Sequence, residues 1–374
     1  MIHPASSEPR ARARDLGIVF GPLPTGPENA ITDVDGVLIG QTTLISGEGP
    51  LIVGEGPVRT GVTVIRPHTG DLGLDPVFAG YHVLNGNGEM TGTIWIEESG
   101  LLTSPIAITN THSVGTVRDA IIAYGAGRGP LGGIWWSLPV VAETYDGGLN
   151  DINGQHVKPE HVYQAMDSAA GGPVAEGNVG GGTGMRCHGF KGGIGTSSRL
   201  VNTAGGVWMV GVLVQANHGE RRHFRVNGLP VGLLITEEEI PARIEPADPS
   251  GSGSIIIVVA TDAPLLPHQC RRLAQRATIG LARAGGNGAD SSGDIFLAFS
   301  TANRPGGASD GPVAVSMLPN AAMTPLFAAV ADATEEAILN ALCMATTMTG
   351  INGRVAHALP LDRLRQIMAR FAAM

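Results

Sequence analysis

The sequence has few charged residues, few aromatic residues and only three cysteines. Charged side chains make up 15% and aromatic side chains 4% of the 374 residues, whereas 43% of the residues are hydrophobic. The 24 Lys and Arg against 33 Asp and Glu give a net charge of −9, with no dense basic stripe. This distribution argues against a surface that neutralises phosphates, so we expect no nucleic-acid partner.

The cysteines and the hydrophobic runs indicate the compartment. Cys187, Cys270 and Cys343 are far apart and form no CxxC motif, which is typical of reduced thiols in a cytoplasmic protein. No hydrophobic run approaches 18 residues, so we expect no membrane span. Residues 1–15 lack the apolar stretch of a secretory signal, and we expect them to form a loose tail.

Motifs for metals and cofactors are missing as well. The eleven histidines show no HExxH or similar metal spacing. The glycine-rich stretch 177–185 is not followed by Gly-Lys-Ser/Thr, and no GxGxxG turn leads from a strand to a helix. We therefore expect neither a metal nor a cofactor, and we interpret these glycines as permitting tight turns or close backbone approach near a site.

Hydrophobic periodicity predicts sheets covered by helices. Apolar runs predict strands at 62–66, 93–96, 106–110, 134–143, 207–216, 231–236, 255–261, 295–300 and 313–318. Helical spacing, with Pro and Gly at the ends, predicts helices after Ser113, at 159–170, from about 262 to 285, at 324–347 and from Pro360 onward. Strands buried on both faces next to helices imply an α/β or α+β layered sandwich. No internal repeat or long linker is present, so we expect one domain.

A serine stands where a flexible segment meets an apolar strand. Residues 247–253 are rich in Gly, Ser and Pro, and the five β-branched residues 255–259 favour a strand buried on both faces. Ser254 would be the first residue of that strand, after a glycine whose backbone is easily strained. Attack of its hydroxyl on the preceding carbonyl would leave Ser254 as both nucleophile and N-terminus, with an α-amine that titrates near about pH 8. An ordinary loop-to-strand junction has the same pattern.

Polar residues at other strand ends could serve such a nucleophile. Asn217 ends the apolar run 207–216, and its amide can donate a hydrogen bond to a developing oxyanion. Ser292 and Asp294 are two residues apart before the strand at 295–300, where they could form a proton relay. An asparagine that caps a strand and a polar turn are the more common readings of these two patterns.

An acid and an aromatic residue follow another predicted strand. Glu143 and Tyr145 share one face of an extended segment and could line one pocket wall. The acid would suit a cationic amine, although a surface acid is the more common occurrence. His218 follows Asn217, but no acid can be assigned to orient it, and we interpret it as structural.

Five segments together resemble one family of enzymes. They are 23–34, 87–90, 109–113, 180–185 and 253–264, the last reading Gly-Ser-Ile-Ile-Ile-Val-Val-Ala-Thr-Asp-Ala-Pro. The chain resembles the DmpA-type L-aminopeptidase/D-esterases and their relatives the β-aminopeptidases, which are self-cleaving enzymes with an N-terminal serine nucleophile. The resemblance implies an α+β fold, a four-layer αββα sandwich similar to the N-terminal-nucleophile hydrolases but differently connected.

The resemblance also implies roles for the candidate residues. Ser254 matches the nucleophile and Gly253–Ser254 the bond that is cleaved, which would divide the domain 1–374 into chains 1–253 and 254–374. Asn217 matches the oxyanion-hole asparagine. Ser292 and Asp294 match a serine and an acid that contact the nucleophile, although some relatives have Glu in place of Asp294.

The resemblance further implies how substrate is bound. Glu143 matches an acid near the free amine of the substrate, and Tyr145 matches a pocket tyrosine of the DmpA branch, where β-aminopeptidases tend to have an aliphatic residue. We therefore expect a serine aminopeptidase, esterase and amidase that acts on small peptides, amides and esters, assembled as a homotetramer. The alternatives are a β-aminopeptidase, an acyltransferase similar to ornithine acetyltransferase, which cleaves before Thr rather than Ser, and a non-catalytic binding protein.

Overall fold

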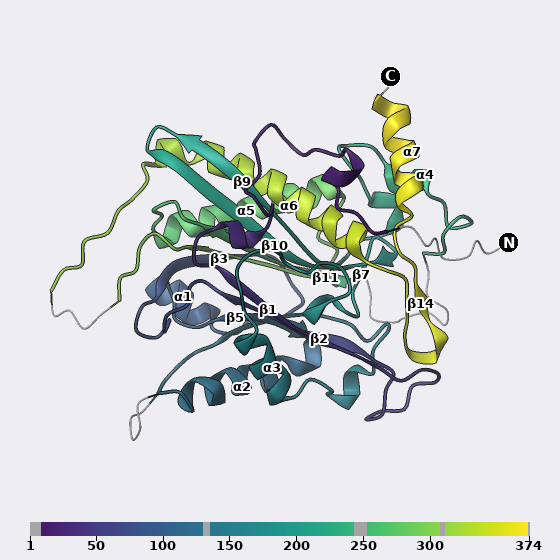
Figure 1. Cartoon of the computed structure of the whole chain (residues 1–374), viewed down its shortest axis with the longest axis horizontal. Helices are drawn as coiled ribbons and strands as arrows, with labels where there is room; N and C mark the ends of the chain where they lie inside the picture. Colours follow the sequence, from purple (N-terminus) through teal and green to yellow (C-terminus); the bar gives the residue numbers. More distant parts are fainter. Residues whose placement is uncertain (1–8, 130–134, 243–252, 307–310, 373–374) are drawn as a thin grey trace.

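The computed structural model describes residues 9–129, 135–242, 253–306 and 311–372. Two sheets lie face to face, with helices covering the outer face of each, so the layers follow the order helix, sheet, sheet, helix (Figure 1). The predicted αββα sandwich is confirmed.

The first layer of strands is a four-stranded sheet. It has the order β1–β2–β5–β6, from β1 (Leu38–Ser46), β2 (Val58–Arg66), β5 (Ile106–Asn110) and β6 (Val140–Thr144). Only β5 and β6 pair in parallel. Its outer face packs on α2 (Val114–Ala126) and α3 (Pro159–Asp167).

The second layer is a six-stranded sheet. Its order is β4–β3–β12–β11–β10–β9, from β3 (Val77–Gly86), β4 (Leu101–Leu102), β9 (Gly193–Thr203), β10 (Gly206–His218), β11 (Gly253–Thr261) and β12 (Gly293–Ser300). The central strands β11 and β12 are parallel and the other pairs antiparallel. Its outer face packs on α5 (Pro267–Ala284) and α6 (Thr324–Met344).

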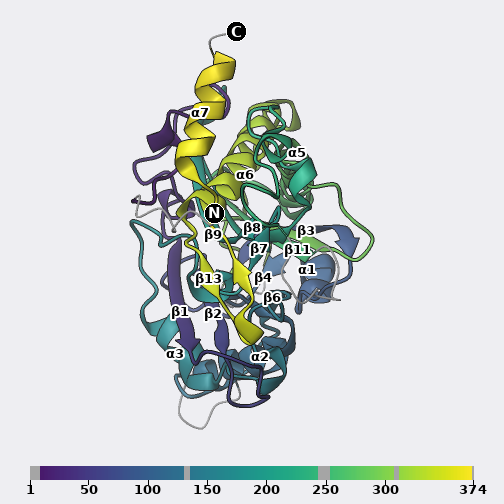
Figure 2. The same cartoon turned by 90° about the vertical axis from the view of Figure 1, so that its right-hand side faces the viewer.

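Short elements complete the chain. They are α1 (Thr93–Ser99), α4 (Val231–Leu234), α7 (Leu361–Ala372) and the hairpins β7–β8 (Arg186–Cys187, Phe190–Lys191) and β13–β14 (Met348–Thr349, Val355–Ala356). After α6 the chain runs down one side of both sheets through β13 and β14 before it turns back to α7 (Figure 2). No helix in the described part of the chain is long and apolar enough to cross a membrane.

Strand β11 is buried on both faces because its side chains alternate between two cores. Ile255, Ile257 and Val259 pack against the α5 and α6 layer. The alternate residues Ile256 and Val258 pack between the two sheets. This double burial is the physical reason for the run of β-branched residues that predicted the strand. By the same alternation, Ser254 lies on the side that faces the other sheet.

Two short segments predicted as strands are helices. Thr93–Ile96 opens α1, where the Thr93 hydroxyl donates to the Met90 carbonyl 3.1 Å away and left-handed glycines precede and follow the helix. The 231–236 segment begins with α4. There Gly232 lies so close to the Arg221 backbone that an added Cβ would be 1.7 Å from its carbonyl oxygen. Tertiary packing thus decided both short runs.

Two other predicted strands differ from the structure. Residues 313–318 form no strand in the described chain, and the Asn303 side chain bonds to both the N–H and the carbonyl of Ser316. Of the strand predicted at 134–143, only the end is formed, as β6, and residue 134 lies outside the described residues. The predicted segment 247–253 lies outside them too, except for Gly253.

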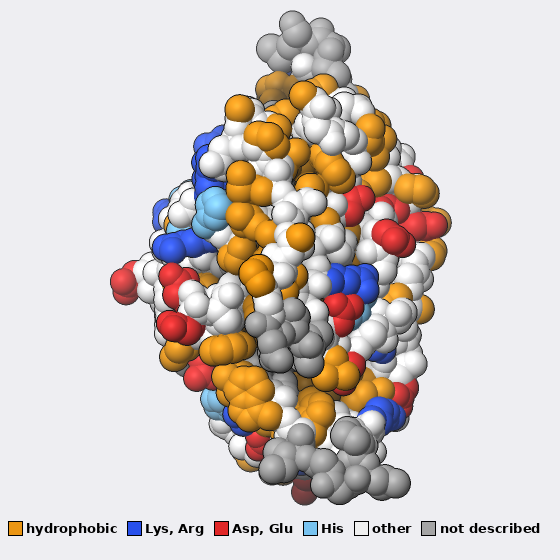
Figure 3. Space-filling model, turned by 90° about the vertical axis from the view of Figure 1, so that its left-hand side faces the viewer, with side chains coloured by type: hydrophobic (Ala, Val, Ile, Leu, Met, Phe, Trp, Pro, Cys, Tyr) orange, Lys and Arg blue, Asp and Glu red, His pale blue; other side chains and the backbone are white. Residues whose placement is uncertain are grey.

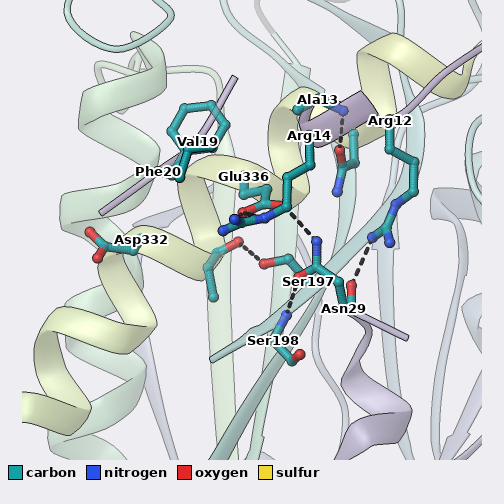
Figure 4. A network of polar contacts seen from close by, with 12 residues as sticks. Arg12, Ala13, Arg14, Val19, Phe20, Asn29, Ser197, Ser198, Asp332 and Glu336 are labelled. Atoms are coloured by element: carbon teal, nitrogen blue, oxygen red, sulfur yellow. Dashed lines mark hydrogen bonds and ion pairs between the residues drawn. The ribbon is translucent and has the colours of Figure 1, made fainter. Parts of the chain in front are cut away.

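The prediction of a loose N-terminal tail is wrong for residues 9–15. The Arg10 side chain donates to the carbonyls of Cys343 and Leu359, at 2.6 and 3.0 Å, and the Ala13 N–H donates to Asn340. Figure 4 shows the adjoining network, in which Arg14 pairs with the buried Glu336 of α6. Specific polar contacts, which have no hydrophobic periodicity, hold this segment in place.

Candidate active site

A large pocket opens where strands of both sheets end. Its volume is about 950 Å³, and its lining includes Ser254, Asn217, Glu143, Tyr145 and Arg186. Tertiary folding brings these residues together from β11, β10, the end of β6 and the β7–β8 hairpin. Five of the seven residues singled out from the sequence therefore line one cavity, Gly253 among them.

Ser254 is held rigidly at the start of β11. The residue is buried, its backbone pairs with Asn217 of β10, and its Oγ accepts a hydrogen bond from the Gly293 N–H at 3.0 Å. Gly253 before it has φ +84°, a conformation that side chains disfavour. An added Cβ there would be 1.8 Å from the Asn217 carbonyl oxygen. This position therefore requires glycine.

The Asn217 amide has a fixed orientation. Its Oδ1 accepts from the Arg186 N–H at 2.8 Å, and its Nδ2 donates to the Tyr145 carbonyl at 2.9 Å. The amide nitrogen carries two hydrogens, and the Tyr145 carbonyl accepts one of them. An asparagine held in this way beside a serine hydroxyl can donate to an oxyanion formed on that serine.

Ser292 and Asp294 form a buried pair beside the nucleophile candidate. The Ser292 hydroxyl donates to Asp294 Oδ1 at 2.6 Å, and burial raises the pKa of the carboxyl. Both residues line a second cavity of about 60 Å³ that shares His218 with the large pocket. Among the described residues, the Ser254 hydroxyl bonds to neither Ser292 nor Asp294. It accepts instead from the N–H of Gly293, the residue between these two in the sequence. The reach of the Asp294 carboxylate to Ser254 is thus not direct in this structure.

Glu143 is a buried acid in the pocket wall. One carboxylate oxygen accepts from the Glu89 N–H at 3.1 Å and the other from the Thr111 hydroxyl. Burial raises the pKa of Glu143, while these two hydrogen bonds act in the opposite direction. Tyr145 lines the same pocket. A buried carboxylate with no cationic side chain among its hydrogen-bond donors is suited to an ammonium group from outside.

His218 belongs to a buried cluster with Cys187 and His188. Their potential ligand atoms lie within 4.8 Å of one another, the sole such group found among the described residues. Cys187 Sγ lies 3.7 Å from His218 Nδ1, and burial raises the pKa of the thiol to about 12. Burial also lowers the pKa of His218 well below its usual range. A neutral His218 packed on a thiol agrees with the structural role predicted for it.

Several residues of the site were not found from the sequence. Gly293 and Arg186 act through backbone N–H groups, and any residue but proline has one. Thr111 lies within a segment that contributed to the family resemblance, but nothing in its spacing pointed to Glu143. The glycine-rich stretch at 177–185 carried a signal, because we expected close backbone approach near a site, and Gly184 lines the pocket.

Comparison with known proteins identifies the family. The model of Peptidase family S58 matches residues 29–356. The Beta-peptidyl aminopeptidase BapA of Sphingosinicella microcystinivorans is 52% identical to this chain over 376 residues, which cover 98% of this chain and 94% of the relative.

Solved structures agree in fold over nearly the whole chain. A Burkholderia sp. beta-aminopeptidase is 51% identical, with a TM-score of 0.87 over 96% of this chain and 99% of that one. The L-aminopeptidase D-Ala-esterase/amidase of Ochrobactrum anthropi, described as a variant of the Ntn hydrolase fold, is 44% identical, with a TM-score of 0.87 over 98% and 99% of the two chains. The chain belongs to peptidase family S58 and is an aminopeptidase of the hydrolase class.

Proposed function

We propose that this aminopeptidase acts through an acyl-enzyme on Ser254. The observation that carries the proposal is the pairing of Ser254 with Asn217 at the wall of the large pocket. The Ser254 hydroxyl attacks the carbonyl of the first residue of the substrate, and the leaving amine takes up a proton. Asn217 donates its second amide hydrogen to the oxyanion, an interaction worth about 3 kcal/mol for one donor. Water then hydrolyses the ester.

Self-cleavage of the Gly253–Ser254 bond makes Ser254 the N-terminal residue of the second chain. The Ser254 hydroxyl attacks the Gly253 carbonyl, the bond to nitrogen breaks, and the α-amine of Ser254 is released with a proton. Hydrolysis of the resulting ester gives chains 1–253 and 254–374. The left-handed conformation of Gly253, which glycine adopts easily, and the rigid placement of Ser254 beside it support this step.

Glu143 binds the ammonium group of the substrate and so restricts cleavage to the first residue. Its burial beside neutral hydrogen-bond donors and its place in the pocket lining support this role. Tyr145 lines the same wall and contacts the amino acyl group. Either the α-amine of Ser254 or the Ser292–Asp294 pair is the general base. The buried hydrogen bond between Ser292 and Asp294 supports the pair, although the pair is connected to the Ser254 hydroxyl only through the N–H of Gly293.

The substrates are small peptides, amides and esters with a free amino terminus. Two amino acyl classes have specific support: Tyr145 favours L-amino acyl groups, whereas the 52% identity to a beta-peptidyl aminopeptidase favours β-amino acyl groups. The acyltransferase alternative has no support, since the family matched is a peptidase family. A panel of L-, D- and β-amino acyl p-nitroanilides, each with its N-acetylated form, tests the proposal. Free-amine substrates should be cleaved and acetylated ones spared; equal cleavage of both would refute the role of Glu143.

We further propose that the protein forms homotetramers in the cytoplasm. Hydrophobic side chains form a band down the face that carries α1 and the described residues 301–306 and 311–319 (Figures 1 and 3). Val313, Val315 and Met317 are about half exposed on that segment, and exposed apolar area of this kind supports a subunit contact. Three buried cysteines, all free, support a reducing compartment. Light scattering after size exclusion measures the assembly.

A further inference from the structure

One buried cation near the pocket has no role in the steps above. Lys191 of β8 is fully buried, and its ammonium donates to three backbone carbonyls, those of Gly182, Met185 and Gly192, at 3.2, 2.8 and 2.9 Å. These acceptors use all three of its hydrogens but carry no formal charge. Burial lowers the pKa of Lys191 to about 7, and Asp146 acts in the opposite direction. Burying an ammonium costs several kcal/mol, so a gain elsewhere must offset it.

The Met185 carbonyl connects Lys191 to the candidate oxyanion donor. The same peptide group that offers this carbonyl to Lys191 offers its other end, the Arg186 N–H, to Asn217 Oδ1 at 2.8 Å. A peptide group is planar and rigid, so fixing its oxygen also fixes the direction of its N–H. A cation at the oxygen polarises the group and makes the N–H a stronger donor.

The orientation of the Asn217 amide depends on this N–H. With Oδ1 bound to Arg186, Nδ2 must face the other way, where the Tyr145 carbonyl accepts one of its hydrogens. Without the Arg186 bond, only the Tyr145 carbonyl would orient the amide, and a turned amide would offer an oxygen in place of the donor, which would repel a developing oxyanion. Lys191 also bonds to the Gly182 carbonyl, so it holds both ends of the turn that precedes Arg186.

We propose that Lys191 is a positioning residue that sets the Asn217 amide for catalysis through the peptide group between Met185 and Arg186. The inference rests on the proposed function, since it requires Asn217 to donate to the oxyanion. The side chain of Lys191 is fully buried and does not line the pocket. We therefore expect Lys191 to affect the stability of the transition state and not the binding of substrate.

A double-substitution cycle tests the proposal. Lys191→Met keeps the length of the side chain and removes its charge and donors. Asn217→Ala removes the amide. We expect Lys191→Met to lower kcat at least 10-fold on an amino acyl p-nitroanilide while KM stays within 2-fold. Asn217→Ala should lower kcat by a factor of about 100 to 1,000. The doubly substituted protein should be no slower than Asn217→Ala, because Lys191 acts only through that amide.

The readouts separate the possible failures. A variant that is cleaved too slowly for turnover to be measured is scored by the rate at which the two fragments form, because self-cleavage also passes through an oxyanion, on the Gly253 carbonyl. If Lys191→Met lowered kcat by the same factor in the unsubstituted protein and in Asn217→Ala, the inference would be overturned and the proposed function would stay intact. An unchanged rate for Asn217→Ala would overturn the proposed function itself.

Controls address the cost of removing a buried polar group. Ser197→Ala removes a buried hydroxyl in β9 that donates to the Ala333 carbonyl at 2.8 Å, away from Asn217. It should lower the melting temperature without lowering kcat. If Lys191→Met does not fold, Lys191→Gln, which retains an amide donor, enters the same cycle with the same expected coupling. If circular dichroism shows both variants unfolded, Lys191 is a folding residue and the inference is wrong.

Discussion

Ser254 lies directly opposite Asn217 in the antiparallel pairing of β11 with β10. Side chains of directly paired residues point to the same face of a sheet, with Cβ atoms about 5 Å apart. Here that face is the one between the two sheets, at the end where the large pocket opens. The distance between the candidate nucleophile and the candidate oxyanion donor is thus fixed by the register of two buried strands.

Replacing Gly253 with alanine should stop self-cleavage. The new Cβ would be 1.8 Å from the Asn217 carbonyl oxygen, and the residue would have to leave φ +84°. Both changes displace the carbonyl that Ser254 must attack. We expect gel electrophoresis to show one uncut chain after an incubation that cleaves the unsubstituted protein to completion.

Gly228→Ala is the matched control for this substitution. Gly228 has φ +79°, nearly the same as Gly253, but an added Cβ would meet nothing within 4 Å. This variant should lose a little stability, on the order of 1 kcal/mol, and should cleave normally. Normal cleavage of Gly253→Ala would show that the geometry at the junction is not required.

The pH dependence of catalysis should report the carboxylate of Glu143. Only the ionised form binds an ammonium group, and burial raises the pKa of this acid. The value of kcat/KM should therefore fall, as the pH is lowered, at a higher pH than an ordinary glutamate would give. Glu143→Gln should raise KM at least 10-fold and remove this acid limb.

Thr111→Val offers a second test of the same carboxylate. The Thr111 hydroxyl donates to Glu143, and this hydrogen bond lowers the pKa of the acid. Its loss should move the acid limb of the kcat/KM profile to higher pH and leave the rate near the plateau almost unchanged. An acid limb that stays in place would assign the titration to another group.

Asp294→Asn should slow the chemical step. The carboxylate accepts from Ser292 at 2.6 Å, and a general base or its partner contributes a factor of about 100 or more. We expect kcat to fall by that factor in single-turnover measurements. If the α-amine of Ser254 is the base instead, kcat should fall less than 10-fold, and the pKa of the basic limb of the pH–rate profile should be unchanged.

The position of Ser254 was predictable because one short stretch carried both of its determinants. Burial on two faces required the β-branched run 255–259, and the close approach to Asn217 required Gly253. The strand β5 and the start of α3 were predicted for similar local reasons, namely a buried run and a proline in the first turn. Where local pattern and tertiary environment agree, the sequence suffices.

The rest depended on contacts between distant residues. The α1 and α4 segments have strand-like composition, yet α1 is bounded by two left-handed glycines and Gly232 of α4 lies against the Arg221 backbone. The 313–318 segment has a strand pattern, yet a single asparagine takes the place of a partner strand. Within the site, the N–H groups of Gly293 and Arg186 have no signature in residue type. That Asn217, Ser292 and Asp294 belong with Ser254 came from the family resemblance.

Glu336→Gln should lower the free energy of unfolding without changing the pocket. The carboxylate pairs with the fully buried Arg199 at 2.6 Å and also accepts from Arg14 and Asn29 (Figure 4). Removing its charge leaves a buried guanidinium without a counter-ion, which costs about 3–5 kcal/mol. Urea denaturation should show this loss, with kcat of the folded fraction unchanged.

The exposed ion pair between Glu239 and Arg363 provides the control. Its atoms are 2.7 Å apart, but both side chains are 40% exposed. Such pairs contribute less than about 1 kcal/mol, so Glu239→Gln should leave the urea midpoint nearly unchanged. Similar midpoints for the two variants would mean that the network around Glu336 does not stabilise the fold.

Intact-mass spectrometry of the unsubstituted protein and of Ser254→Ala, with activity measured on the same samples, tests the central claim most directly. The unsubstituted protein should give two masses, those of chains 1–253 and 254–374, and hydrolyse an amino acyl p-nitroanilide. Ser254→Ala should give one mass and no hydrolysis. A single, uncut mass with full activity in the unsubstituted protein, or turnover by Ser254→Ala, would contradict the account.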